Sequence, residues 1–449
     1  MKKFIYISIF SILAACDKQL DVVPTQSIDE TTALATPQDV KVTLIGAYDG
    51  LADGDVYGGG FQFTSELVGD DREVLFRGTF TTLDEMWRKA MTAGNIQVRD
   101  TWRDAYVAIN RVNNVLSALD ILDAADKSQV EGEARMIRGS IYLGLVNLFA
   151  KGWGDGDNNT NLGVPLVTTP TRRVEAVDSR PRATVAAVYT QILEDLTKAE
   201  QLLPATSAGD NTGFATRNGA TALLARIYLI QGNFAAARDA AQKVIASGEH
   251  ELADTYEDIF DDESAGHETE SLFKVIVTDQ DGVNSLNTYF APPQFAGRGD
   301  IVVQAKHTAL YTADDPRGKF TFTTSNRPYT RKFNNQFADV LIIRLAELYL
   351  IRAETNFRLG TAIGATPVSD INRIRTRAGA GTISQADLTL ERLLLERKLE
   401  LMFEGQLLQD VRRLKKNVGT LPYSDPKLVL PIPQREMDTN KSLVQNTGY

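Results

Sequence analysis

Apolar residues along much of the chain recur at spacings of three and four, which is the period of an amphipathic α-helix. Several of the connections between these periodic segments are short, so neighbouring helices are expected to pack as antiparallel hairpins. The chain is therefore predicted to be mainly α-helical and built from helix pairs. The segments with this pattern are 37–51, 98–122, 128–150, 184–203, 222–247 and most of 337–414.

One helix pair, within residues 222–247, also matches a known repeat. Ala225 and Ala237 flank a Gly232-Asn233-Phe234 turn, and small residues in these places let two helices approach closely in tetratricopeptide repeats. A single repeat cannot bury its own apolar face, so further pairs are required. The candidates for these pairs are 98–150, 184–231 and 340–378.

Two long segments, 52–80 and 249–336, lack the helical period and are rich in turn residues. Only Leu272–Val277 within them reads as a short strand. We expect long irregular loops here. Long loops in a compact scaffold are usually either functional or disordered, and the aromatic residues of the second segment favour order. The C-terminal segment 428–449 contains prolines and is predicted to be extended.

The segment 337–414 mixes arginines and glutamates with its leucines. Buried charges need partners, and the planar guanidinium suits carboxylates. We interpret these residues as a structural network of ion pairs that locks the helices together. The alternative is a catalytic carboxylate pair, for example Glu347 with Glu354.

The N-terminal residues predict that the protein is exported and anchored by a lipid. Two lysines precede an apolar run over residues 4–13, which is too short for a comfortable membrane span. The run ends in Leu-Ala-Ala-Cys, and this Cys16 is the only cysteine of the chain. We predict a lipoprotein signal peptide over 1–15, lipidation of Cys16, and a polar tether over 16–36. An ordinary signal peptide with an incidental cysteine is the alternative.

Composition narrows the possible functions. Hydrophobic residues make up 43% of the chain and charged residues 24%, as in an ordinary globule. There are 48 basic and 58 acidic side chains, a net charge of −10, which argues against nucleic acid as a partner. The three histidines are scattered, and no motif of a metalloprotease, serine hydrolase or phosphate loop is present. The sequence predicts no cofactor, no metal site and no catalytic residue.

Several longer motifs together resemble the SusD/RagB family of nutrient-uptake outer-membrane lipoproteins. The motifs near the C-terminus are specific when they occur together, although Lys441 stands where the family usually has a proline. The motifs are the Cys16 lipobox, EGEARMIRGSIYLGLV (131–146), LAELYLIRAETNFRLG (345–360), DINRIRTRAG (370–379), LLERKLELMFEG (394–405) and LPIPQREMDTNKSLVQNTGY (430–449).

The resemblance implies a SusD-like fold: a tetratricopeptide-like scaffold of four helix pairs with long irregular loops and a few short strands. It implies one globular domain over 37–449, with an N-terminal part at about 37–232 and a C-terminal part at about 233–449. Members of the family capture oligosaccharides, or peptides in some branches, without catalysis. They deliver them at the cell surface to a TonB-dependent, SusC-like transporter in the outer membrane.

Glycan recognition needs aromatic faces for sugar rings and planar polar groups for hydroxyls. Trp102 lies on a core stripe and Trp153 at a helix end, so Trp87 is the best tryptophan candidate. The predicted ligand-binding residues are Asp71, Arg72, Trp87, Tyr289, Phe290, Phe295 and Arg298. Two other functions stay open at this point: a surface glycoside hydrolase, whose carboxylates carry no local signature, and a tetratricopeptide scaffold that binds only proteins.

Overall fold

The computed structural model describes residues 34–172, 179–206, 213–261, 263–280 and 282–449. Cys16 and nearly all of the predicted tether lie outside the described residues. Among the helices that are described, none combines the length and the apolar character needed to cross a membrane.

Helices dominate the structure, as predicted. They are α1 (Pro37–Ala52), α2 (Gly60–Gly69), α3 (Thr81–Arg88), α4 (Ile96–Ser117), α5 (Ala124–Phe149), α6 (Val185–Leu202), α7 (Arg217–Ile230), α8 (Phe234–Ser247), α9 (Ala265–Glu270), α10 (Ser285–Phe290), α11 (Ala305–Thr308), α12 (Leu345–Leu359), α13 (Pro367–Arg377), α14 (Leu390–Leu401), α15 (Leu407–Arg413) and α16 (Gln434–Thr439). The strands are β1 (Val74–Phe76), β2 (Ser271–Val275), β3 (Ile301–Val303), β4 (Thr321–Thr324), β5 (Arg327–Thr330) and β6 (Val340–Arg344).

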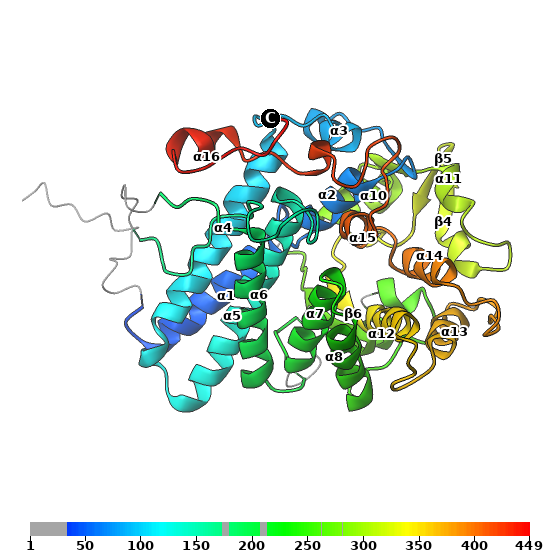
Figure 1. Ribbon diagram of the computed structural model, residues 1–449, viewed down its shortest axis with the longest axis horizontal. Coiled ribbons are helices and arrows are strands. Elements are labelled where there is room, and N and C mark those ends of the chain that lie inside the picture. Colours follow the sequence, from blue (N-terminus) through cyan, green and yellow to red (C-terminus); the bar gives the residue numbers. More distant parts are fainter. Residues whose placement is uncertain (1–33, 173–178, 207–212, 262, 281) are drawn as a thin grey trace, which may run out of the picture.

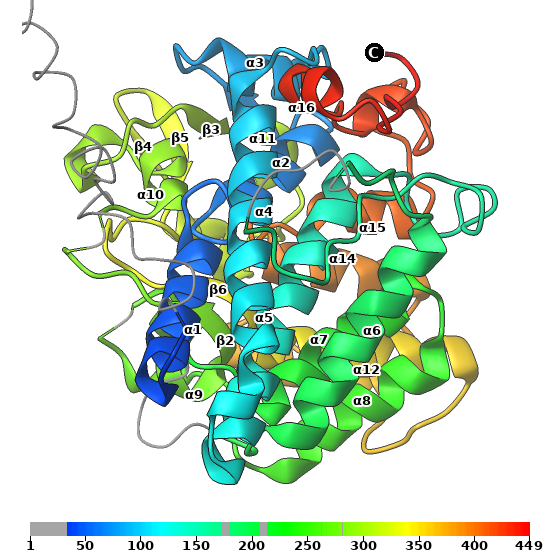
Figure 2. The same ribbon diagram turned by 90° about the vertical axis from the view of Figure 1, so that its left-hand side faces the viewer.

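The long helices lie side by side in one row. The order across the row is α1, α4, α5, α6, α7, α8, α12 and α13, and each packs on the next (Figures 1 and 2). Helix α8 packs on α12 although residues 248–344 separate them in the sequence. This row is the predicted array of helix pairs, and the elements of 249–344 lie to one side of it.

The close approach within the row depends on small residues. A Cβ atom on Gly132 of α5 would lie 2.7 Å from Cγ of Leu203, so the end of α6 can pack there only against a glycine. In the predicted repeat, Ala225 and Ala237 are fully buried where α7 meets α8. Asn233 caps α8 by accepting a hydrogen bond from the amide of Ala236.

The predicted loop 52–80 is partly wrong. It contains the helix α2, whose ten residues are all buried, and the strand β1. A helix that is covered on every side needs no polar face, so it shows no amphipathic period. The Gly/Asp-rich composition around it concealed the helix further.

The predicted helix over the start of 337–414 is also wrong at its first residues. Val340–Arg344 forms β6, which pairs antiparallel with β2 and is almost entirely buried. Short apolar runs do not distinguish a buried strand from a buried helix. The strand predicted at Leu272–Val277 is confirmed, with its bounds shifted to β2.

The last predicted helix of that segment divides into α14 and α15. The break lies at Phe403 and Gly405, whose φ angles are +64° and +82°. A Cβ on Gly405 would lie 2.8 Å from Cα of Gln62, so α2 occupies the space beside the turn. The C-terminal segment is extended as predicted, except for the short helix α16.

Candidate functional site

A short antiparallel sheet joins the two irregular segments. Val74 of β1 pairs with Val303 of β3, and Phe76 pairs with Ile301. The pairing brings residues 70–73 to one end of the sheet together with 304–307. Residues 77–80 come to the other end together with 298–300. The predicted ligand residues therefore divide between two places, one at each end of this sheet.

At the first end, Trp87 is held by internal hydrogen bonds. Its Nε1 donates to Oδ2 of Asp70 at 3.2 Å and to the carbonyl oxygen of Val74 at 3.1 Å. The indole is half-buried and packs on the core. The polar edge of Trp87 therefore fixes α3 to the start of β1.

The predicted polar residues Asp71 and Arg72 are more open. Asp71 forms a 2.6 Å ion pair with Lys306. Arg72 is exposed and has a φ of +60°, because the carboxylate of Asp70 accepts hydrogen bonds from the amides of Arg72, Glu73 and Val74 in a tight turn.

A cavity of about 210 Å³ lies beside this first end, and Asp71 and Lys306 line it together with side chains of α14 and α15. Burial raises the pKa of Glu66 in its wall to about 8, although the carboxylate accepts hydrogen bonds from the amides of Gly405 and Leu407. Burial also lowers the pKa of Lys89, which donates to two carbonyl oxygens near Trp87, to about 8.

At the other end of the sheet, an arginine lies on an exposed aromatic ring. The guanidinium of Arg298 is 4.4 Å from the centroid of Phe80, and this phenylalanine is 43% exposed. Nε of Arg298 donates to Asp300 at 2.9 Å, and Nη2 donates to Thr79 at 3.1 Å. The ring of Tyr289 meets Phe80 edge-on at 6.3 Å.

A second arginine–aromatic pair continues this region. The guanidinium of Arg331 is 4.6 Å from the centroid of Phe322 in β4, and Phe295 meets the same ring at 5.9 Å. Gly299, next to Arg298, links the two pairs. It has a φ of +64°, and a Cβ there would lie 2.9 Å from the ring of Tyr329, which neighbours Phe322.

We call this region the aromatic–arginine surface. It brings together three of the predicted ligand residues and three residues that were not predicted. The predicted members are Tyr289, Phe295 and Arg298; the missed members are Phe80, Phe322 and Arg331.

Phe290 is a correction. Its side chain is fully buried and packs between the rings of Phe333 and Phe403, at 5.2 and 5.3 Å. Adjacent residues of a helix lie on different faces, so Tyr289 of α10 reaches the surface while Phe290 enters the core. Phe290 cannot contact a ligand in this structure.

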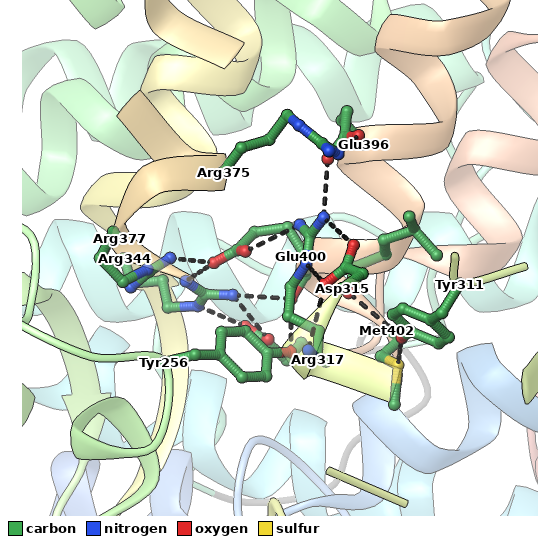
Figure 3. Close-up of polar contacts among 12 residues, drawn as sticks. Tyr256, Tyr311, Asp315, Arg317, Arg344, Arg375, Arg377, Glu396, Glu400 and Met402 are labelled. Atoms are coloured by element: carbon green, nitrogen blue, oxygen red, sulfur yellow. Dashed lines mark hydrogen bonds and ion pairs between the residues drawn. The ribbon is translucent and has the colours of Figure 1, made fainter. Parts of the chain in front are cut away.

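The charged residues of 337–414 form a buried network elsewhere (Figure 3). Glu400 lies between three arginines: it bonds Arg344 at 2.8 Å, Arg317 at 3.4 Å, and Arg377. Burial would raise the pKa of Glu400, but these three positive charges hold it at about 2. The network was predicted as structural, and the burial of Glu400 and its ion pairs with three arginines agree with that role.

The alternative of a catalytic carboxylate pair gains no support from the geometry. Glu347 is bound by Arg226 at 2.6 Å and Arg397 at 3.2 Å, and Glu354 is bound by Arg413 at 2.7 Å. Both side chains are at most 2% exposed. Each carboxylate is thus enclosed by guanidinium groups and does not face a reacting molecule.

Two groups of side chains in the described residues have the spacing of metal ligands. His267, Glu268 and Asp339 form one, but the ammonium of Lys274 bonds both of its carboxylates and already supplies the positive charge. The other is a cluster of three aspartates at positions 53, 55 and 104. Here Asp55 accepts a hydrogen bond from Gln97, and burial raises its pKa to about 6.

Comparison with known proteins indicates the family of this chain. A family model described as "Starch-binding associating with outer membrane" matches residues 18–229, and a model described as "SusD family" matches residues 316–425. SusD-like protein P2 of Formosa agariphila is 25% identical over the full length of both chains.

Solved structures share the fold of this chain. A SusD superfamily protein of Bacteroides thetaiotaomicron superposes with a TM-score of 0.80 at 24% identity, covering 92% of this chain and 99% of the other. A laminarin-binding SusD-like protein superposes with a TM-score of 0.77 at 23% identity, covering 92% and 100%. The chain described here belongs to the SusD family, and the model that matches its residues 18–229 is described as starch-binding and associating with the outer membrane.

Proposed function

We propose that this protein captures oligosaccharides at the aromatic–arginine surface and passes them to a SusC-like, TonB-dependent transporter. The observation that carries the binding site is the stack of Arg298 on Phe80, a ring that stays 43% exposed although the structure offers a large core. Sugar rings pack their C–H faces on such aromatic rings, while guanidinium groups donate to hydroxyls.

The remaining contacts support a rigid site. Tyr289 is itself braced by Phe63, whose ring lies 4.9 Å away in the buried helix α2. Phe295 ends a short 3-10 helix that begins at Pro293, and Ala296 after it has a φ of +62°. Side chains that are held in place before binding lose little conformational entropy when a ligand arrives.

Binding is tested by calorimetric titration of the purified protein with a panel of oligosaccharides of defined linkage, including laminarin fragments because one solved relative is named for that ligand. We expect binding to at least one glycan and its loss in a Phe80→Ala, Phe295→Ala double variant. A Leu359→Ala variant, at a leucine exposed on α12, is the control. Binding that persists in the double variant would place the site elsewhere.

The competing functions predict different results in the same titrations. A hydrolase would release new reducing ends from the bound glycan, and a protein-binding scaffold would respond to no sugar. A peptide ligand, which the family resemblance allows, would bind where every sugar fails. We expect a bound glycan to be recovered unchanged.

Delivery and anchoring are separate parts of the proposal. We propose that Cys16 carries the lipid anchor and that the protein faces outward from the outer membrane. Labelled palmitate should be incorporated by the natural chain and not by a Cys16→Ser variant. An outer-membrane TonB-dependent transporter should co-purify with the natural chain in detergent.

A further inference from the structure

The aromatic–arginine surface differs in charge from the protein as a whole. The chain has a net charge of −10. This surface, however, holds the exposed arginines Arg298 and Arg331. A third exposed arginine, Arg77, lies beside it in the fold, since its amide donates to the carbonyl oxygen of Asp300. A local cluster of positive charge on an acidic protein attracts anions to that place.

The acidic groups nearby are already bound. Asp300 is buried and accepts the hydrogen bond from Nε of Arg298. Asp84, on the helix that follows Phe80, forms an ion pair with Arg88 at 2.9 Å. Asp55, which interacts electrostatically with Tyr289, accepts a hydrogen bond from Gln97. These carboxylates neutralise part of the positive charge but do not engage Arg331.

The arginines keep donors for a ligand. Among the described residues, neither Arg77 nor Arg331 forms an ion pair or a side-chain hydrogen bond. Arg298 uses two of its five N–H groups, one to Asp300 and one to Thr79, and three remain. An arginine stacked on a ring presents its N–H edge outward, and this edge matches a carboxylate or a sulfate with two parallel hydrogen bonds.

We infer that the aromatic–arginine surface selects acidic oligosaccharides, which carry carboxylate or sulfate groups, over neutral ones of the same linkage. The inference rests on the proposed function and narrows it to a ligand class. The rings of Phe80, Phe322 and Phe295 would take sugar faces, while Arg298 and Arg331 would bind the anionic substituents beside them.

The test uses matched pairs of glycans with the same backbone and linkage, of which one member carries the anionic groups and the other has them esterified or removed. One pair is a galacturonate tetrasaccharide and its fully methyl-esterified form; another is a sulfated galactan tetrasaccharide and its desulfated form. We expect the charged member of at least one pair to bind about tenfold or more tightly, as for one charge-assisted bidentate contact. This preference should shrink as salt rises from low to physiological concentration.

Variants assign the preference to the arginines. An Arg298→Gln, Arg331→Gln double variant should bind the charged and the neutral member of a pair with equal affinity, although both affinities fall because the two arginines also contact hydroxyls. The control is Arg435→Gln, an exposed arginine of α16, which lies far from β4 (Figure 1). Circular dichroism and the unfolding midpoint verify that both variants are folded.

Each remaining outcome contradicts a specific claim. Equal affinity for charged and neutral members overturns the inference and leaves the proposed function standing. A preference that the double variant retains overturns the assignment to Arg298 and Arg331, and with it the inference. Absence of binding to any glycan by the folded protein overturns both the inference and the proposed function.

Discussion

Arginines occupy two contrasting regions of this protein. In the network around Glu400 they are buried and bonded to carboxylates from several elements (Figure 3). On the aromatic–arginine surface they are exposed and lie on phenylalanine rings. The arginine side chain thus stabilises the packing in one region, where its charge is paired with carboxylates, and we propose that it recognises a ligand in the other, where donors remain.

The difference follows from what each arginine can find as a partner. A buried guanidinium without a carboxylate would cost several kcal/mol, so a network inside the fold must be complete. An exposed guanidinium is stabilised by water and can leave donors open at little cost. A region crowded with charges is therefore weak evidence for a ligand site when the charges are paired. Exposed guanidinium N–H groups without a partner are stronger evidence.

The largest expected effect breaks the buried network. Glu400→Gln leaves Arg344, Arg317 and Arg377 with one negative charge fewer and should lower the free energy of unfolding by about 3–5 kcal/mol. Urea unfolding followed by circular dichroism measures this. Glu391→Gln, at an exposed glutamate of the same helix, is the control and should change stability by less than about 0.5 kcal/mol. A comparable loss in both variants would mean that the network is not what stabilises α14.

Acid should reveal the same network without a mutation. The pKa of Glu400 is about 2 in the folded protein against an ordinary 4.5, so the folded state binds fewer protons between these values. Its contribution is complete above pH 4.5 and is lost as the pH falls toward 2, which amounts to roughly 3 kcal/mol. Unfolding free energies measured between pH 6 and pH 3 should fall less steeply in Glu400→Gln. An unchanged slope would contradict the low pKa.

A substitution of Trp87 tests whether this predicted ligand residue stabilises the fold or binds the ligand. Trp87→Phe keeps an aromatic ring but removes the Nε1 donor to Asp70 and Val74, so the free energy of unfolding should fall by about 1–2 kcal/mol. Because the indole edge is used internally, oligosaccharide affinity should change less than twofold. A large loss of affinity in the calorimeter, with stability intact, would return Trp87 to the ligand site.

The sequence predicted the parts of the fold that repeat and missed the parts that depend on distant contacts. Helix α1 and the α7–α8 pair follow from the three-four spacing and from the small residues at their contact. Helix α2 and strand β6 were missed because both are covered on all sides and therefore have no polar face. The period of apolar residues identifies an element that is buried on one face, but it does not identify an element that is buried on all faces.

The same limit applies to the site. Tyr289, Phe295 and Arg298 could be selected because aromatic and basic residues in a long loop favour ligand binding. Phe80 could not be joined to them, since the pairing of Phe76 with Ile301 that brings the two loops together leaves no local signal in either. The neighbours Tyr289 and Phe290 could not be told apart, because which one faces outward depends on Phe333 and Phe403 in other segments.

Substitution of Phe80 should have the smallest effect on stability. It tests whether the aromatic–arginine surface serves binding while the network around Glu400 serves stability. Phe80→Ala removes a ring that is 43% exposed, so unfolding should change by less than about 1 kcal/mol. Oligosaccharide affinity should fall roughly three- to tenfold, since an aromatic contact contributes about 0.5–1.5 kcal/mol. Phe80→Tyr should restore most of it, because the ring is kept. If alanine at this position weakens folding and leaves affinity unchanged, the Arg298 stack is a structural contact like those around Glu400, and the two regions do not differ in the way proposed.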